Sequence, residues 1–169
     1  KARDLYRRAF EVDPTDPYPL GHYLSYEIAR QRNTAMIPLM RPVIESVIRR
    51  CRAQADVGMN LPWAFYDLGC FHLLLCDPYA SLAAYSKAIQ LSAASFMIAT
   101  SLENLKRLEP VKQELEGYDW VRRLLWLGLA ARFPAMSLIR PGSAPTGAAS
   151  MTRSAPAAAP AADPAPESR

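Results

Sequence analysis

The stretch PWAFYDLGCFHLLLCDPYASLAAYSKAIQLSAAS, residues 62–95, decides the fold because it encodes two adjoining helices. Apolar and aromatic side chains recur every three or four residues on both sides of Cys76-Asp77-Pro78, which is the spacing of one helical face. Pro78 cannot continue a helix from the residues before it. We therefore predict helices over 62–76 and 79–92, joined by a turn short enough to make an antiparallel hairpin.

Small residues in this hairpin lie where its two helices should cross. Gly69 and Ser81 leave room for a close approach, and Tyr85 has the size to fill the remaining gap. The segment resembles a tetratricopeptide repeat (TPR), a resemblance carried by Phe65, Leu68-Gly69, His72, Ser81, Tyr85 and Ala88. It departs from the family at His72, where tyrosine is usual, at Ser81, where alanine is usual, and at Ala93, where proline often closes the unit.

The segments before the hairpin resemble the same family less evenly. Residues 1–16 have a helical pattern over 1–12, with Ala2, Tyr6, Ala9 and Pro14 at the spacing of a second TPR helix and its closing turn. They resemble half a repeat, and we therefore expect the chain to be a fragment of a longer protein. Residues 17–58 would form a degenerate repeat with helices over 17–32 and 35–55, in which Pro42 should kink the second helix or delay its start.

Helical patterns continue after the hairpin without matching the family. We predict helices over 95–108, 110–115 and 118–132, and we interpret 96–140 as capping helices that cover the last repeat. The pattern of apolar residues predicts no strand. The sequence thus predicts an all-α domain over residues 1–140, and the resemblance implies antiparallel helix hairpins stacked as a TPR-like α-solenoid.

The end of the chain has a different composition. Residues 141–169 are mostly alanine, proline and serine, and Met151 is their only large apolar residue. Such a segment buries too little apolar surface to offset its ordering entropy, so we predict a disordered Ala/Pro-rich tail or linker. A proline-motif ligand for a peptide-binding domain is the alternative interpretation.

Charge and cysteine content exclude several classes of protein. The 169 residues include 20 Lys and Arg against 16 Asp and Glu, a net charge of +4 that is spread over several helices, so we expect no nucleic-acid binding. Three cysteines without paired spacing indicate a reducing compartment, and we expect a cytoplasmic protein. The apolar run LLWLGLAA, residues 124–131, is far shorter than the ~20 residues of a membrane span, so we expect no span.

The residues that could carry chemistry form no recognisable catalytic or metal-binding motif. Cys70, His72 and Cys76 are close in sequence, but a helix would point the two cysteines in different directions. His22 and His72 are the only histidines, and the acids, Asp67 among them, fall where solvated helix faces or caps would place them. We expect no enzymatic activity, no cofactor and no metal site.

The resemblance to TPRs implies a concave surface made by the first helix of each repeat. Its positions would be Trp63, Tyr66, Cys70, Leu73 and Leu74, with Tyr18, Gly21, Ser25 and Ile28 from the weaker unit. Chaperone-binding members of the family clamp a C-terminal carboxylate with Lys and Asn at such positions, whereas this surface is aromatic and apolar. We expect Trp63, Tyr66, Cys70, Leu73 and Tyr18 to contact a partner, unless Trp63 and Tyr66 only pack between hairpins.

Two functions fit these features. The first is a non-catalytic protein–protein interaction module that binds a peptide or partner domain, possibly another domain of the same chain, on the concave helical surface. The alternative is a regulatory or spacer segment of a larger signalling enzyme whose catalytic domain lies outside this fragment. A helical repeat associated with RNA is a weaker interpretation, and its binding would be lost above moderate salt.

Overall fold

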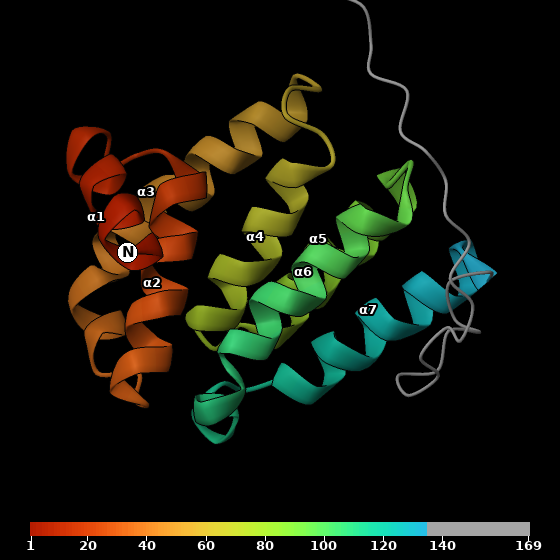
Figure 1. The fold of residues 1–169 in the computed structure, drawn as a ribbon. Coiled ribbons are helices and arrows are strands. Elements are labelled where there is room, and N and C mark those ends of the chain that lie inside the picture. Colours follow the sequence, from red (N-terminus) through yellow and green to blue (C-terminus); the bar gives the residue numbers. More distant parts are fainter. Residues whose placement is uncertain (135–169) are drawn as a thin grey trace, which may run out of the picture. The chain divides into compact units, whose positions relative to one another are not determined.

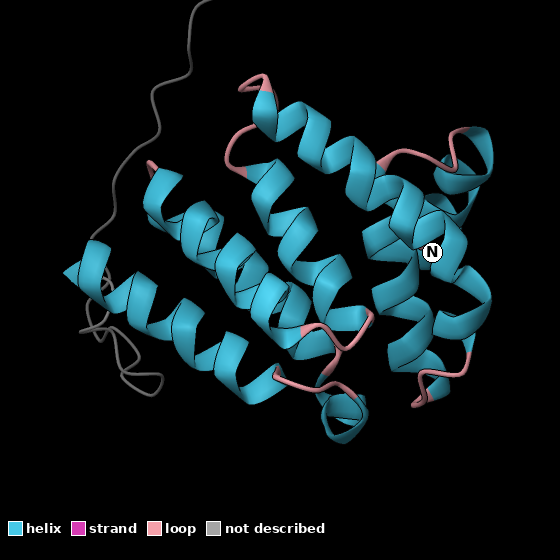
Figure 2. Ribbon diagram, turned by 180° about the vertical axis from the view of Figure 1, so that it is seen from behind, coloured by secondary structure: helices cyan, strands magenta, loops and turns pink. Residues whose placement is uncertain are grey.

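A computed structural model describes residues 1–134, in which every regular element is a helix (Figures 1 and 2). The elements are α1 (Ala2–Val12), α2 (Pro17–Gln31), α3 (Met36–Asp56), α4 (Trp63–Leu74), α5 (Pro78–Leu91), α6 (Ser95–Arg107), the 3-10 helix η1 (Glu109–Glu114) and α7 (Tyr118–Arg132). The all-α prediction is confirmed for these residues, and each helix ends within two residues of its predicted bounds. The predicted tail over 141–169 lies outside the described residues.

Two Asp-Pro pairs begin helices. The Asp16 carboxylate accepts a hydrogen bond from the Tyr18 backbone N–H at 3.0 Å, and the Asp77 carboxylate accepts one from the Ala80 N–H at 3.2 Å. These bonds satisfy donors that a first helical turn leaves free, while Pro17 and Pro78 supply the φ angle that a first position needs. The two Asp-Pro pairs therefore set where α2 and α5 begin.

Pro42 does not delay α3. The helix begins at Met36 and continues through Pro42 to Asp56, so of the two predicted effects, a kink or a delayed start, the delayed start is wrong. Pro42 lies in the second turn and is exposed, so its ring meets solvent rather than packed side chains. The missing N–H removes one backbone hydrogen bond near the end of a 21-residue helix that the rest of its length sustains.

Helices α4 and α5 form the predicted antiparallel hairpin with a very close crossing. A Cβ added at Gly69 would lie only 2.6 Å from Cδ2 of the buried Tyr85 ring. The Ser81 hydroxyl donates a 2.7 Å hydrogen bond to the Gly69 carbonyl across the same crossing. The close approach therefore depends on the small residue at each of these two positions.

The remaining helices pack on both sides of this hairpin. Helix α3 packs against α4, α1 packs against α2, and α7 packs against both α5 and α6 (Figure 1). A second glycine lets α7 approach α5, because a Cβ added at Gly128 would lie 2.8 Å from Ile89 Cδ1. Helix α7 thus covers the side of α5 that the α4–α5 hairpin leaves open.

Segments far apart in the chain also meet, since α2 contacts both α6 and η1. The Thr34 backbone N–H and hydroxyl donate hydrogen bonds to the Glu114 carboxylate at 3.0 and 2.6 Å. Helices α2 and α4 meet where Gly21 lies against Phe71, one of the largest fully buried side chains. The three helices α2, α4 and α6 consequently surround one cleft.

Candidate functional site

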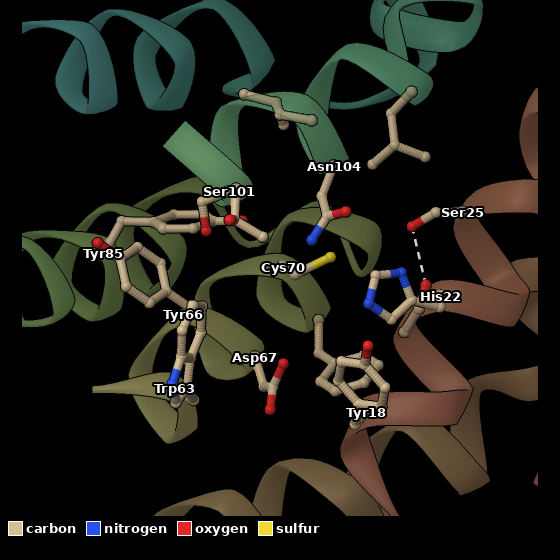
Figure 3. Close-up of a pocket in the computed structure, with 15 residues that line it drawn as sticks. Tyr18, His22, Ser25, Trp63, Tyr66, Asp67, Cys70, Tyr85, Ser101 and Asn104 are labelled. Carbon is tan, nitrogen blue, oxygen red and sulfur yellow. Dashed lines mark hydrogen bonds between the residues drawn. The ribbon is translucent and has the colours of Figure 1, made fainter. Parts of the chain in front are cut away.

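The cleft between α2, α4 and α6 is the principal candidate site of the described residues (Figure 3). It has a narrow inner part of about 70 Å3 and a wider outer part of about 760 Å3. Both parts are lined by Tyr18 and His22 from α2, Trp63 and Asp67 from α4, and Thr100 and Asn104 from α6. Three helices that are distant in sequence therefore contribute to one cavity.

The aromatic wall of the cleft has an exposed and a buried part. Tyr18 is 59 % exposed and Trp63 is partly exposed, so both present ring surface to a ligand. Tyr66 is only 4 % exposed, and its hydroxyl lies 2.7 Å from that of Ser92, which itself donates to the Ala88 carbonyl. Tyr66 thus links α4 to the end of α5 and supports the wall from behind.

Two titratable side chains in the cleft have strongly shifted pKa values. Burial, with a smaller contribution from Asp16, raises the pKa of the Asp67 carboxyl to about 7. Burial and the nearby Arg107 cation lower the pKa of His22 to about 4. At neutral pH the His22 imidazole is therefore uncharged, while the Asp67 carboxyl is protonated in about half of the molecules.

The thiol in the cleft is not activated. Burial, followed by the charge of Asp67, raises the pKa of Cys70 to about 12. A nucleophilic cysteine needs a thiolate, which usually requires a neighbouring cation or a helix N-terminus. Cys70 therefore acts as a protonated, weakly polar side chain in the cleft wall.

One side chain of α6 bridges the cleft to α2. The Arg107 guanidinium lies 4.7 Å from the centroid of the Tyr26 ring, and its Nη1 donates to the Asn104 side-chain oxygen at 2.7 Å. The same nitrogen lies 3.5 Å from His22 Nδ1. Tyr6, Tyr18, His22 and Tyr26 form the aromatic cluster on which this cation rests.

The residues predicted to contact a partner lie in different environments. Tyr18, Trp63 and Cys70 line the cleft, and Tyr66 lines its inner part although it is buried. Leu73 is fully buried in the core, as is Leu74, and neither lines the cleft. Helix α4 is apolar on nearly all sides, so its sequence does not reveal which apolar side chains face outward.

Sequence reasoning missed the polar part of the site. Asp67 was expected on a solvated face or at a cap, but it lies within α4 and lines the cleft. A signal was present, since Asp67 follows Trp63 by four residues and precedes Cys70 by three, which places all three on one helical face. No comparable signal marks Thr100, Ser101 and Asn104 of α6.

His72 and the other cysteines belong to the scaffold. The His72 ring is buried between two charged partners, with Nε2 lying 3.2 Å from Arg52 and Nδ1 lying 3.3 Å from Asp77. Cys51 is buried and Cys76 is exposed, and within residues 1–134 no three His, Cys, Asp or Glu side chains are grouped as metal ligands would be. In this part of the chain, no helix combines the length and apolar character needed to cross a bilayer.

Comparison with known proteins does not assign the chain to a family. No protein-family model, curated protein or solved structure matches it. The arguments that follow therefore rest on the residues of the cleft.

Proposed function

We propose that this protein is a non-catalytic interaction module that binds an extended segment of a protein partner in the cleft between α2, α4 and α6. The observation that carries the proposal is the pair of accessible aromatic side chains, Tyr18 and Trp63, that line a cleft of about 760 Å3. Rigid aromatic side chains at a concave site are the usual anchors of a protein interface. A cavity of this size suits a drug-sized ligand or a few side chains of a peptide.

The arrangement of the helices supports a TPR-like organisation. The first helices of the two proposed repeats, α2 and α4, line the cleft together with α6, while α5 packs against α4 through Gly69 and the Tyr85 ring, which reaches the inner part of the cleft. In an open solenoid each unit contacts only its neighbours. Because α2 also contacts α6 here, we propose a short and tightly curved stack whose concave side is narrow.

The chemistry of the cleft supports binding rather than catalysis. Burial keeps the Cys70 thiol protonated, with a pKa of about 12, and His22, whose pKa is lowered to about 4, lies beside Arg107. A nucleophile needs a neighbouring base that is oriented by a third group. Among the hydrogen bonds of the described residues, none joins His22 to Cys70 or to Asp67.

Selection from a peptide library tests the proposal. The full chain would be used to select from displayed random peptides of twelve residues, and the affinity of enriched peptides would be measured by fluorescence anisotropy. We expect Trp63→Ala and Tyr18→Ala each to weaken binding at least tenfold, since truncation of an interface anchor costs about 2 kcal/mol or more.

Matched variants distinguish the cleft from other exposed aromatic side chains. Tyr79 and Trp126 are 76 % and 54 % exposed and do not line the cleft, so Tyr79→Ala and Trp126→Ala should leave the affinity unchanged. Circular dichroism of every variant should remain helical. Failure to enrich any peptide, or enriched peptides that bind all four variants equally well, would rule the proposal out.

A further inference from the structure

Two carboxylates on neighbouring helices, Glu27 of α2 and Asp67 of α4, differ in whether a hydrogen bond or ion pair reaches them. Glu27 of α2 is buried, yet it accepts hydrogen bonds from Arg30 and from Gln31 and pairs with Arg3 at 3.4 Å. Among residues 1–134, no hydrogen bond or ion pair reaches the Asp67 carboxylate, although it is partly buried in α4. Asp67 is only partly buried and lines the open cleft, so a cation that enters from outside can reach its carboxylate without displacing a partner among the described residues.

Aromatic rings lie around this carboxylate. Figure 3 shows the Asp67 side chain in the cleft with Trp63 on one side and Tyr18 on the other, and both rings line the same cavity. The faces of Trp and Tyr rings attract cations through their quadrupole. A group that carries a positive charge on an apolar stem could place its charge on the carboxylate and its stem against the rings.

The protein already places one cation on the neighbouring rings. The Arg107 guanidinium rests on Tyr26 at 4.7 Å and is held by Asn104, so the α2 aromatic cluster accepts a cation within the chain itself. Arg107 has no ion pair with Asp67 among the described residues. Arg107 therefore occupies the rings of the α2 cluster, whereas no cation of the described residues pairs with Asp67.

The charge of the cleft is opposite to that of the chain. Its outer part is lined by the carboxylates of Asp16, Asp67 and Glu103 and by one cation, Arg107, whereas the whole sequence has a net charge of +4. An acidic cavity on a basic chain selects positively charged groups and disfavours negatively charged ones. The absence of a cation beside Asp67 also agrees with the raised pKa of its carboxyl, about 7.

We propose that the cleft holds a lysine or arginine side chain of the bound peptide, with its charged group on the Asp67 carboxylate and its methylene stem against Trp63 and Tyr18. This inference rests on the proposed peptide-binding function and adds the chemical class of the residue that is recognised. The same three side chains also line the narrow inner part of the cleft, whose volume of about 70 Å3 limits how deeply a stem can enter.

Small side-chain analogues test the site without a peptide. The 15N-labelled full chain would be titrated at pH 8 and constant ionic strength with n-butylammonium, with n-butylguanidinium and with butyrate, while the indole N–H signals of the three Trp residues are followed. We expect a saturable shift of the Trp63 signal with both cations. We expect none with butyrate, and none at Trp120 or Trp126, which lie on α7 outside the cleft.

A charge-removing variant assigns the binding to Asp67. Asp67→Asn keeps the shape of the side chain and should weaken n-butylammonium binding at least tenfold, whereas Asp119→Asn, which removes an exposed carboxylate of α7, should not change it. The proposal fails if butyrate shifts the Trp63 signal as the cations do. It also fails if the cations give no saturable shift or if Asp67→Asn binds them as tightly as the natural chain.

The same experiments separate this inference from the proposed function. If selected peptides bind in a Trp63-dependent way but keep their affinity when each Lys and Arg is replaced by norleucine, the cleft binds peptides and the cationic site is wrong. If n-butylammonium binds in an Asp67-dependent way but no peptide is enriched, the cationic site stands and the peptide-binding function is wrong.

Discussion

Two helix–helix contacts of this protein are built in opposite ways. Helices α4 and α5 meet over Gly69, where the Tyr85 ring leaves no space for a Cβ, so the two helices are in close contact. Helices α6 and α2 meet through long polar side chains, with Arg107 on the Tyr26 ring and beside His22. The α4–α5 contact is set by the distance between two backbones and forms the scaffold. The α6–α2 contact is made by side chains that reach across the cleft.

The difference assigns a role to each region. Close packing around a glycine transmits any added volume directly to the backbone. A contact through a partly exposed guanidinium is weaker and can be lost while the helices remain folded. The comparison therefore predicts that changes in α4–α5 affect global stability, whereas changes in α2–α6 affect the cleft.

The largest effect is expected from Gly69→Leu. The added side chain would collide with a buried aromatic ring, and we expect a loss of about 3 kcal/mol or more in the free energy of unfolding, measured by urea denaturation. Gly21→Ala is the matched control, because a Cβ there would lie 3.6 Å from Phe71 Cζ, an ordinary contact. It should stabilise the chain by up to about 1 kcal/mol through helix propensity. Equal effects of the two substitutions would contradict the close crossing.

An intermediate effect is expected from Asp67→Asn, and it depends on pH. The folded-state pKa of about 7 lies above the unfolded value near 4, so this carboxyl stabilises the fold below pH 4 and loses that contribution as the pH rises through 7. Three pKa units correspond to about 4 kcal/mol, and solvent screening of a partly exposed side chain reduces this to about half. The variant should therefore be about 2 kcal/mol more stable than the natural chain at pH 8 and equally stable near pH 4.

Urea denaturation at several pH values measures this difference. His22 titrates in both proteins, so its contribution cancels when the two curves are subtracted. A difference that stays constant between pH 4 and pH 8 would show that Asp67 is not desolvated in the folded protein.

The smallest effect is expected from Arg107→Ala. Loss of the cation from Tyr26 and of its hydrogen bond to Asn104 should cost about 1 kcal/mol. Amide hydrogen exchange should rise in α6 but not at the α4–α5 crossing. The pKa of His22 should rise, since one cause of its depression is removed, and an NMR titration of the ring would measure this.

Arg123→Ala is the control for this variant, because it removes an exposed arginine of α7 that lies outside the cleft. It should leave both the exchange of α6 and the His22 titration unchanged. If Arg107→Ala also left both unchanged, the bridge between α6 and α2 would have no energetic significance.

The features of the fold that could be predicted from the sequence are those that depend on interactions between residues close together in the chain. Asp16-Pro17 and Asp77-Pro78 mark helix starts because their caps and φ angles act within one turn. Gly69 marks the α4–α5 crossing because a glycine within an apolar helix indicates that another chain segment approaches. Pro42 misled because its position in the second turn makes it far less disruptive than a proline at the centre of a helix.

The candidate site was predictable on two of its three walls, since Tyr18 of α2 and Trp63 of α4 were both expected to contact a partner and both line the cleft. The resemblance to TPRs supplied the α4 positions, and Asp67 could have been added because it shares a helical face with Trp63 and Cys70. The resemblance also placed Leu73 on the concave surface, but Leu73 is fully buried, and a helix with apolar residues on every side has no pattern that would have corrected this. The α6 wall could not be inferred, because no local pattern says which helix will lie opposite α4.

The sequence by itself determined the helices, their ends and the close α4–α5 hairpin, since these depend on periodicity, capping and residue size within a few turns. Only the tertiary structure decided that α7 packs on α5, that α6 meets α2, and that Asp67 lines an aromatic cleft without an ion pair to another described residue. The physical reason is the range of the interactions. Contacts between residues 18–26 and 100–107 arise only after several helices have packed, and no short stretch of sequence encodes them.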